Sequence, residues 1–184
     1  MIIGICGKSG CGKSTLARRI AKKNDNVIHL EIDKVGHNTL KIENVKQELV
    51  NNYGEIILDG NNINRKKLGA IVFDSEAEME KLTDITWKYM QIEIDKIIEE
   101  NEDKIIILDW ILLPKSKYLE KCDIKILLDI PYEIRKKRAI ERDNITEEAF
   151  DLREKASIKY DESCFNYVIK EDNEYEIKRL VELI

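Results

Sequence analysis

The sequence Gly7-Lys8-Ser9-Gly10-Cys11-Gly12-Lys13-Ser14, followed by Thr15, decides the fold of this chain. It matches the pattern G-x-x-x-x-G-K-[ST], which is typical of loops that bind phosphate groups. The apolar run 2–6 before it is predicted to be a buried strand, and residues 16–23 after it have the spacing of an amphipathic helix. Because strand, glycine-rich loop and helix follow in this order, we expect a phosphate site rather than a simple glycine-rich turn without a ligand.

The residue types in this segment, called the phosphate loop below, explain the expected chemistry. Glycines let successive backbone N–H groups turn toward phosphate oxygens, and the following helix adds its positive N-terminal end. Lys13 can reach the outer phosphates, and the Ser14 hydroxyl can bind magnesium. We therefore predict that ATP and Mg²⁺ are the cofactors, with the nucleotide held by Gly7, Lys8, Ser9, Gly10, Cys11, Gly12, Lys13, Ser14 and Thr15.

The composition favours a globular protein that works in water. Of the 184 residues, 43% are hydrophobic and 36% are charged, and the net charge of −5 argues against a general nucleic-acid surface. The four cysteines form no C-x-x-C pair and only two histidines are present, so a zinc site is not expected. With no membrane-length apolar run and no signal peptide expected, we predict a cytoplasmic protein without membrane or nucleic-acid partners. The oligomeric state stays open.

Short apolar runs alternate with helical patterns along the chain, which predicts a parallel sheet covered by helices on both faces. Residues 53–58 are ambiguous, and 59–62 are a turn signal. The region 34–102 contains little clear strand and is predicted to be a helical insertion over the carboxyl ends of the strands. The expected strands are 2–6, 27–32, 104–109, 124–130 and 166–169, and the expected helices are 16–23, 43–52, 65–72, 76–100, 132–142, 146–157 and 175–183.

Two carboxylates are expected at the edge of the sheet that carries the phosphate loop. Asp33 follows the second predicted strand, and Asp109 ends the third. A carboxylate at this edge can hold magnesium or accept a proton from an attacking hydroxyl. Either residue alone could equally cap a loop, but two on one edge beside a phosphate loop favour function.

A basic cluster marks the predicted helix 132–142. Arg135, Arg138 and Arg142 are spaced so that one helical face carries three guanidinium groups. Such a face can stabilise a migrating phosphoryl group from a lid over the nucleotide. A solvated basic surface is the alternative interpretation.

Together these segments resemble the dephospho-CoA kinase family, and the resemblance runs nearly from end to end. The segment 53–73 is its most distinctive part, because other small kinases lack it. The matching residues are the phosphate loop, Asp33-Lys34 with His37, Tyr53-Gly54 with Ile57-Leu58, Gly60, Ile63-Asn64-Arg65, Leu68, Val72-Phe73, Asp109 with Leu112-Leu113, and Arg138 with Arg142-Asp143.

The resemblance implies a three-layer α/β/α P-loop kinase fold with a five-stranded parallel sheet, a helical acceptor-binding insertion and a lid helix. The single kinase domain would comprise a core at 1–33, 104–131 and 162–184, the insertion at about 34–102 and the lid at about 132–160. The implied reaction is ATP-dependent phosphorylation of the 3′-hydroxyl of dephospho-CoA, a step of coenzyme A biosynthesis.

The resemblance also implies a role for each candidate site residue. Lys13, Asp33, Arg138 and Arg142 are the implied catalytic residues, with Asp33 as the base or as the group that orients the acceptor. The resemblance also implies that Asp33 and Arg65 bind the acceptor, for which His37 and Asp109 are further candidates. From their residue types and positions, Ser14 and Asp109 are the expected metal ligands.

Two alternatives remain open from the sequence. Departures from the family pattern, among them Thr86-Trp87 and Lys115, leave room for a kinase of another small acceptor such as a nucleoside or nucleotide. A regulatory protein that binds a nucleotide without catalysis is the other alternative, although such a protein has no need of a lid rich in arginine.

Overall fold

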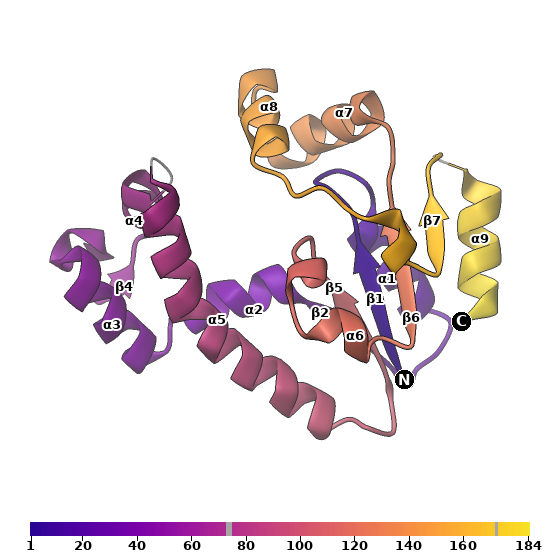
Figure 1. The fold of residues 1–184 in the computed structure, drawn as a ribbon, viewed down its shortest axis with the longest axis horizontal. Coiled ribbons are helices and arrows are strands. Elements are labelled where there is room, and N and C mark those ends of the chain that lie inside the picture. Colours follow the sequence, from indigo (N-terminus) through magenta and orange to yellow (C-terminus); the bar gives the residue numbers. More distant parts are fainter. Residues whose placement is uncertain (73–74, 172) are drawn as a thin grey trace. The chain divides into compact units, whose positions relative to one another are not determined.

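The computed structural model describes residues 1–72, 75–171 and 173–184 (Figure 1). The chain divides into two compact units, one formed by Met1–Glu31 and Asn101–Ile184 and the other by Ile32–Glu100. Phe73, which belongs to the predicted family motif, lies outside the described residues. Among the described helices, none combines the length and the apolar character needed to cross a bilayer.

The first unit is built on a parallel sheet. Within the described residues its strands are β1 (Ile2–Cys6), β2 (Val27–Glu31), β5 (Ile105–Asp109), β6 (Ile124–Leu128) and β7 (Tyr167–Ile169), in the order β2-β5-β1-β6-β7. Because β1 lies at the centre while β2 lies beyond β5, the loop after β1 opens at the carboxyl edge of the sheet, where doubly wound folds bind ligands.

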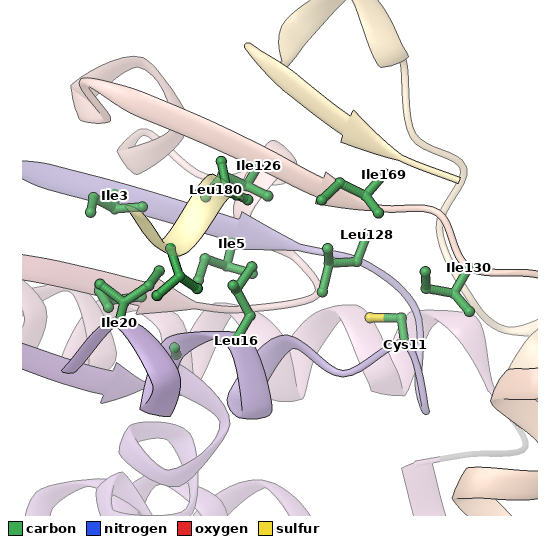
Figure 2. Packing of buried hydrophobic residues seen from close by; sticks show 13 residues of the cluster. Ile3, Ile5, Cys11, Leu16, Ile20, Ile126, Leu128, Ile130, Ile169 and Leu180 are labelled. Carbon is green, nitrogen blue, oxygen red and sulfur yellow. The ribbon is translucent and has the colours of Figure 1, made fainter. Parts of the chain in front are cut away.

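One face of this sheet is covered by α1 (Lys13–Ala21) and α9 (Glu174–Leu183). Figure 2 shows Ile3 and Ile5 of β1 packed with Leu16 and Ile20 of α1, and Leu180 of α9 belongs to the same buried cluster. The opposite face of β1 presents Gly4, and a side chain there would clash with Leu113 and Cys122. These two residues lie in a 3-10 turn (Leu113–Lys115) and just after α6 (Tyr118–Lys121), so the sheet is enclosed from both sides.

The chain after β6 forms two helices, α7 (Tyr132–Asp143) and α8 (Glu147–Lys155), and then a 3-10 turn (Glu162–Cys164). The Thr146 hydroxyl caps α8 by accepting a hydrogen bond from the Ala149 N–H, as its position in the sequence predicts. Asn144 closes α7 in the left-handed conformation, with φ of 50°. The predicted helix 132–142 is therefore confirmed and is one residue longer than expected.

The second unit is helical, with a small hairpin. It contains α2 (Ile32–Thr39), α3 (Glu43–Tyr53), a 3-10 turn (Glu55–Ile57), β3 (Leu58–Asp59), β4 (Asn62–Ile63), α4 (Arg65–Val72) and α5 (Glu76–Glu99). The helices α2, α3 and α4 each pack against α5, and the buried residues include Val45, Leu49, Ile57, Leu68, Val72 and Ile85. The turn signal at 59–62 is the turn of the hairpin.

The structure corrects the predicted end of the second strand. The sequence predicts a strand over 27–32 that leads directly to Asp33, but β2 ends at Glu31 and Asp33 lies in the first turn of α2. The reason is that Ile32 fits two patterns. It continues the apolar run of the strand, yet it is buried together with Val35 and Thr39 at helical spacing.

Candidate active site

The phosphate loop joins the end of β1 to the start of α1. Gly12 precedes α1 with φ of 98°, a conformation that favours glycine, and its carbonyl accepts hydrogen bonds from the N–H groups of Thr15 and Leu16 at 3.0 Å each. Lys13 opens the helix, and its Nζ donates to the Gly7 carbonyl at 2.8 Å. The ammonium group therefore lies across the loop, beside backbone N–H groups suited to bind anions.

Asp109 ends β5 beside the loop and is 5% exposed. Its Oδ2 accepts a hydrogen bond from the Ser14 hydroxyl at 2.6 Å and lies 3.2 Å from His29 Nε2. Burial acts to raise the pKa of this carboxyl, but the hydrogen bond from His29, the charge of Lys13 and the hydrogen bond from Ser14 outweigh it, so the pKa is lowered. Asp109 is therefore ionised at neutral pH.

The Ser14 and Asp109 oxygens fit a magnesium ion. Both are hard oxygen donors at one edge of the sheet, and magnesium at phosphate sites is usually held by one or two protein oxygens together with phosphates and water. In the described part of the chain no cluster of three or more His, Cys, Asp or Glu side chains could hold a metal without such help. The donor set suits a metal that arrives with the nucleotide.

A cavity of about 290 Å³ lies beside the start of α1. Gly12, Thr15 and Arg138 line it together with apolar side chains that include Ile130 and Ile177. A wall of apolar and charged side chains, with the guanidinium groups of Arg138 and of Arg19 (which is paired with Glu174) and the N-terminus of a helix, can accept a planar base and its attached phosphates. The structure thus brings Arg138 to the same cavity as Gly12 and Thr15 of the phosphate loop.

Arg135 does not share the position expected of it. The sequence pattern predicts that it lies on one phosphate-facing surface with Arg138 and Arg142. In the structure it is 5% exposed and donates to the Ile130 carbonyl and to both oxygens of Glu154. Glu154 also accepts from Lys8 of the phosphate loop at 2.7 Å. The sequence pattern could place three guanidinium groups on one helical face, but it could not show that a carboxylate of the next helix binds one of them.

Arg142 is more exposed and pairs with its neighbour. Its Nε and one terminal nitrogen donate to the Asp143 carboxylate at 2.7 and 2.9 Å, and Arg153 of α8 donates to the same carboxylate at 2.5 Å. The hydrogen bonds from Arg142 and Arg153 outweigh the effect of burial and lower the pKa of Asp143 to about 2.

We expect Asp143→Asn to lower the free energy of unfolding by about 1 kcal/mol near pH 7, after allowance for solvent screening. Because the pKa of Asp143 is lower in the folded state than in the unfolded chain, its contribution is present above about pH 4 and is lost as the pH falls toward 2. Urea unfolding of the wild type and the variant at pH 7, 5, 4 and 3 measures this. Glu141→Gln, at an exposed position on the same helix, is the control, and a difference that stays constant down to pH 3 would contradict the prediction.

The second unit contains Asp33, His37 and Arg65. A terminal nitrogen of Arg65 lies 2.6 Å from His37 Nε2, so this nitrogen accepts the hydrogen bond. Burial, and then the charge of Arg65, lower the pKa of His37, while the Asp33 carboxylate acts in the opposite direction. The imidazole is therefore neutral at pH 7. The structure places these three predicted acceptor-side residues within one unit, on α2 and at the start of α4.

The similarity to known proteins agrees with this geometry. A family model described as dephospho-CoA kinase matches residues 1–177. The chain belongs to the dephospho-CoA kinase family. Dephospho-CoA kinase of Aquifex aeolicus is 38% identical over 172 residues, which are 91% of this chain and 86% of that protein. The resemblance expected from the sequence is confirmed.

Solved structures support the fold of this dephospho-CoA kinase family member. The protein TT1252 from Thermus thermophilus has a TM-score of 0.84 and 22% identity, covering 100% of this chain and 95% of its own. Dephospho-CoA kinase from Campylobacter jejuni has a TM-score of 0.65 and 21% identity, with 99% and 94% covered. The predicted α/β class with a five-stranded parallel sheet is confirmed.

Sequence reasoning missed two contacts of this kinase-family site. His29 of β2 bonds the Asp109 carboxylate, and Glu154 bonds Lys8. The position of His29 was a weak indication of its contact. A histidine in an otherwise apolar strand is partly buried and therefore needs a hydrogen-bond partner, such as a residue on the neighbouring strand. The thiols of Cys6, just before the loop, and Cys11, within it, are buried, and burial raises the pKa of both. They are therefore packing groups and not nucleophiles.

Proposed function

We propose that this protein transfers the γ-phosphoryl group of ATP to the 3′-hydroxyl of dephospho-CoA and so forms coenzyme A. The observation that carries this proposal is the phosphate loop with Ser14 bonded to a buried, ionised Asp109, in a chain that belongs to the dephospho-CoA kinase family. Phosphoryl transfer depends chiefly on positioning and on stabilisation of negative charge, and these groups are suited to both.

On the donor side, the backbone N–H groups of residues 7–15 would bind the phosphates. Lys13 would compensate the charge that develops on the transferred group, and Arg138 with Arg142 would add positive charge from the segment 132–160, which we propose acts as a lid. Ser14 and Asp109 would hold magnesium. When bound, that ion supplies charge neutralisation between the outer phosphates.

On the acceptor side, we assign the helical region of about 34–102 to acceptor binding. Asp33 would accept or orient the proton of the attacking hydroxyl. Arg65, which donates a hydrogen bond to the neutral His37, would bind an anionic part of the acceptor. The neutral imidazole keeps the positive charge of this group on Arg65.

The test is an assay of ADP release with ATP, Mg²⁺ and dephospho-CoA, combined with identification of the product by mass spectrometry. Coenzyme A is the matched control acceptor, because its 3′-hydroxyl is already phosphorylated. We expect ADP release that depends on dephospho-CoA and is absent with coenzyme A. Turnover with nucleosides or nucleotides in its place would favour the other class of kinase, and ATP binding without any acceptor-dependent turnover would favour a regulatory protein.

A further inference from the structure

Three charged side chains connect the phosphate loop to the two helices that follow β6. Lys8 Nζ lies 2.7 Å from one oxygen of Glu154 on α8, and Arg135 of α7 donates to both oxygens of this carboxylate, at 2.8 and 3.1 Å. Each oxygen of Glu154 therefore has a cationic partner. In Figure 1, α7 and α8 lie beyond the carboxyl ends of β1 and β6, where the loop is. We call these three residues the loop–lid cluster.

The loop–lid cluster is partly shielded from water. The exposed fractions of the Lys8, Glu154 and Arg135 side chains are 24%, 21% and 6%. Hydrogen-bonded ion pairs in such surroundings are stronger than pairs on the open surface, and removing one partner leaves the other poorly compensated. The hydrogen bond from Arg135, followed by that from Lys8, lowers the pKa of Glu154, so the carboxylate is ionised at neutral pH.

The backbone of α7 also touches the phosphate loop directly. A Cβ atom at Gly10 would lie 2.2 Å from the Arg135 carbonyl oxygen, so only glycine allows this approach. The Nε of the same guanidinium group donates to the Ile130 carbonyl at 2.8 Å, which holds the Arg135 side chain on a second side. Arg138 lies three residues further on α7 and lines the cavity with Gly12 and Thr15. The place of Arg135 therefore sets the place of Arg138.

We propose that Glu154 is a positioning residue that ties α8 and α7 to the phosphate loop through Lys8 and so fixes Arg138 beside the nucleotide. The proposal rests on the proposed function in one respect, which is that MgATP occupies the phosphate loop. Lys8 then contributes to nucleotide binding through its contact with Glu154, which keeps α7 and α8 in a fixed position relative to the phosphate loop. It does not act by an independent contact with a phosphate.

The experiment compares Glu154→Gln, Lys8→Met and the double variant with the wild type. The readouts are the Kd of MgATP from calorimetry and hydrogen–deuterium exchange over residues 7–15 and 132–157. We expect each single variant to weaken MgATP binding about tenfold, which is the usual effect of losing one charge-assisted hydrogen bond. The double variant should lie within about twofold of the single ones, because both substitutions break the same tie. Exchange in α8 should rise in all three variants.

Glu147→Gln is the matched control. Glu147 pairs with Lys136 at 2.7 Å and so joins the same two helices, but this pair leaves Lys8 and Glu154 in place. Its Kd for MgATP should stay within twofold of the wild type. A similar loss in Glu147→Gln, additive losses in the double variant, or unchanged binding in Glu154→Gln would overturn the proposal.

Two features keep the test decisive. If Glu154→Gln fails to fold because Arg135 is left without its carboxylate, Lys8→Met still breaks the tie while the Arg135–Glu154 pair remains. If the wild type does not bind MgATP, the proposed function is refuted, but exchange in α8 still decides whether the tie exists. No acceptor is needed, so the result is independent of which hydroxyl compound the enzyme phosphorylates.

Discussion

Replacing Lys13 by methionine is expected to lower kcat by about 10²- to 10³-fold. The methionine side chain keeps most of the length of the lysine stem but loses the ammonium group that lies across the phosphate loop, 2.8 Å from the Gly7 carbonyl. In a site that excludes water, a fixed positive charge acts mainly on the negative charge that develops during phosphoryl transfer. The measurement is steady-state ADP release at saturating ATP, with the melting temperature recorded in parallel.

Lys22→Met provides the comparison for Lys13→Met. Lys22 is exposed and follows the last residue of α1, so this variant removes the same charge from the opposite end of the same helix. We expect its kcat to match the wild type. If Lys13→Met retained more than a tenth of the wild-type kcat while folding normally, the loop would not act as assigned.

The second large effect is expected for Asp33→Asn, which should lower kcat by about 10²- to 10⁴-fold. Asparagine has almost the same size and can still accept a hydrogen bond at one oxygen, but it cannot take up the proton of the attacking hydroxyl. The Kd of MgATP should change by less than about twofold, because Asp33 lies in α2 and not among the phosphate-loop residues. The variant would thus lose kcat while keeping its affinity for MgATP, as expected for a group that acts in the transition state.

Asp84→Asn is the control for this charge loss, since Asp84 is exposed on α5 of the same unit. It should leave both kcat and KM for the acceptor unchanged. A rise in KM for the acceptor without loss of kcat in Asp33→Asn would mean that the carboxylate only orients the substrate. If Asp33→Asn changed neither kcat nor the KM for the acceptor, Asp33 would not be part of the site.

Much of the fold could be predicted from local patterns in the sequence. The glycine-rich loop with its flanking strand and helix placed β1 and α1, and the Thr146 hydroxyl marked the start of α8. These features arise from residues near each other in the chain, whose preferences act before any tertiary contact forms. The hairpin of β3 and β4 escaped detection because each strand has two residues, too few to display an alternation of apolar and polar side chains.

The partners within the site could not be predicted in the same way. His29 and Asp109 are 80 residues apart, and Arg135 and Glu154 are 19 apart. Which carboxylate meets which cation depends on strand register and on how two helices pack, and many pairings satisfy the same sequence. For this reason the sequence yields the candidate residue types of the site, whereas the distinction between Arg135 and Arg138 required the structure.

The close approach of Gly10 to the Arg135 carbonyl also limits how this enzyme can move. A segment whose backbone rests on another backbone, and whose side chain is held by the Ile130 carbonyl, travels with the sheet as one body. Because Arg135 sets the place of Arg138, we expect the pivot for any opening of the segment that follows to lie beyond Arg138, at the left-handed Asn144 that ends α7. We expect an opening at this point to move α8 relative to α7 and so to break the contacts of Glu154 with Lys8 and Arg135.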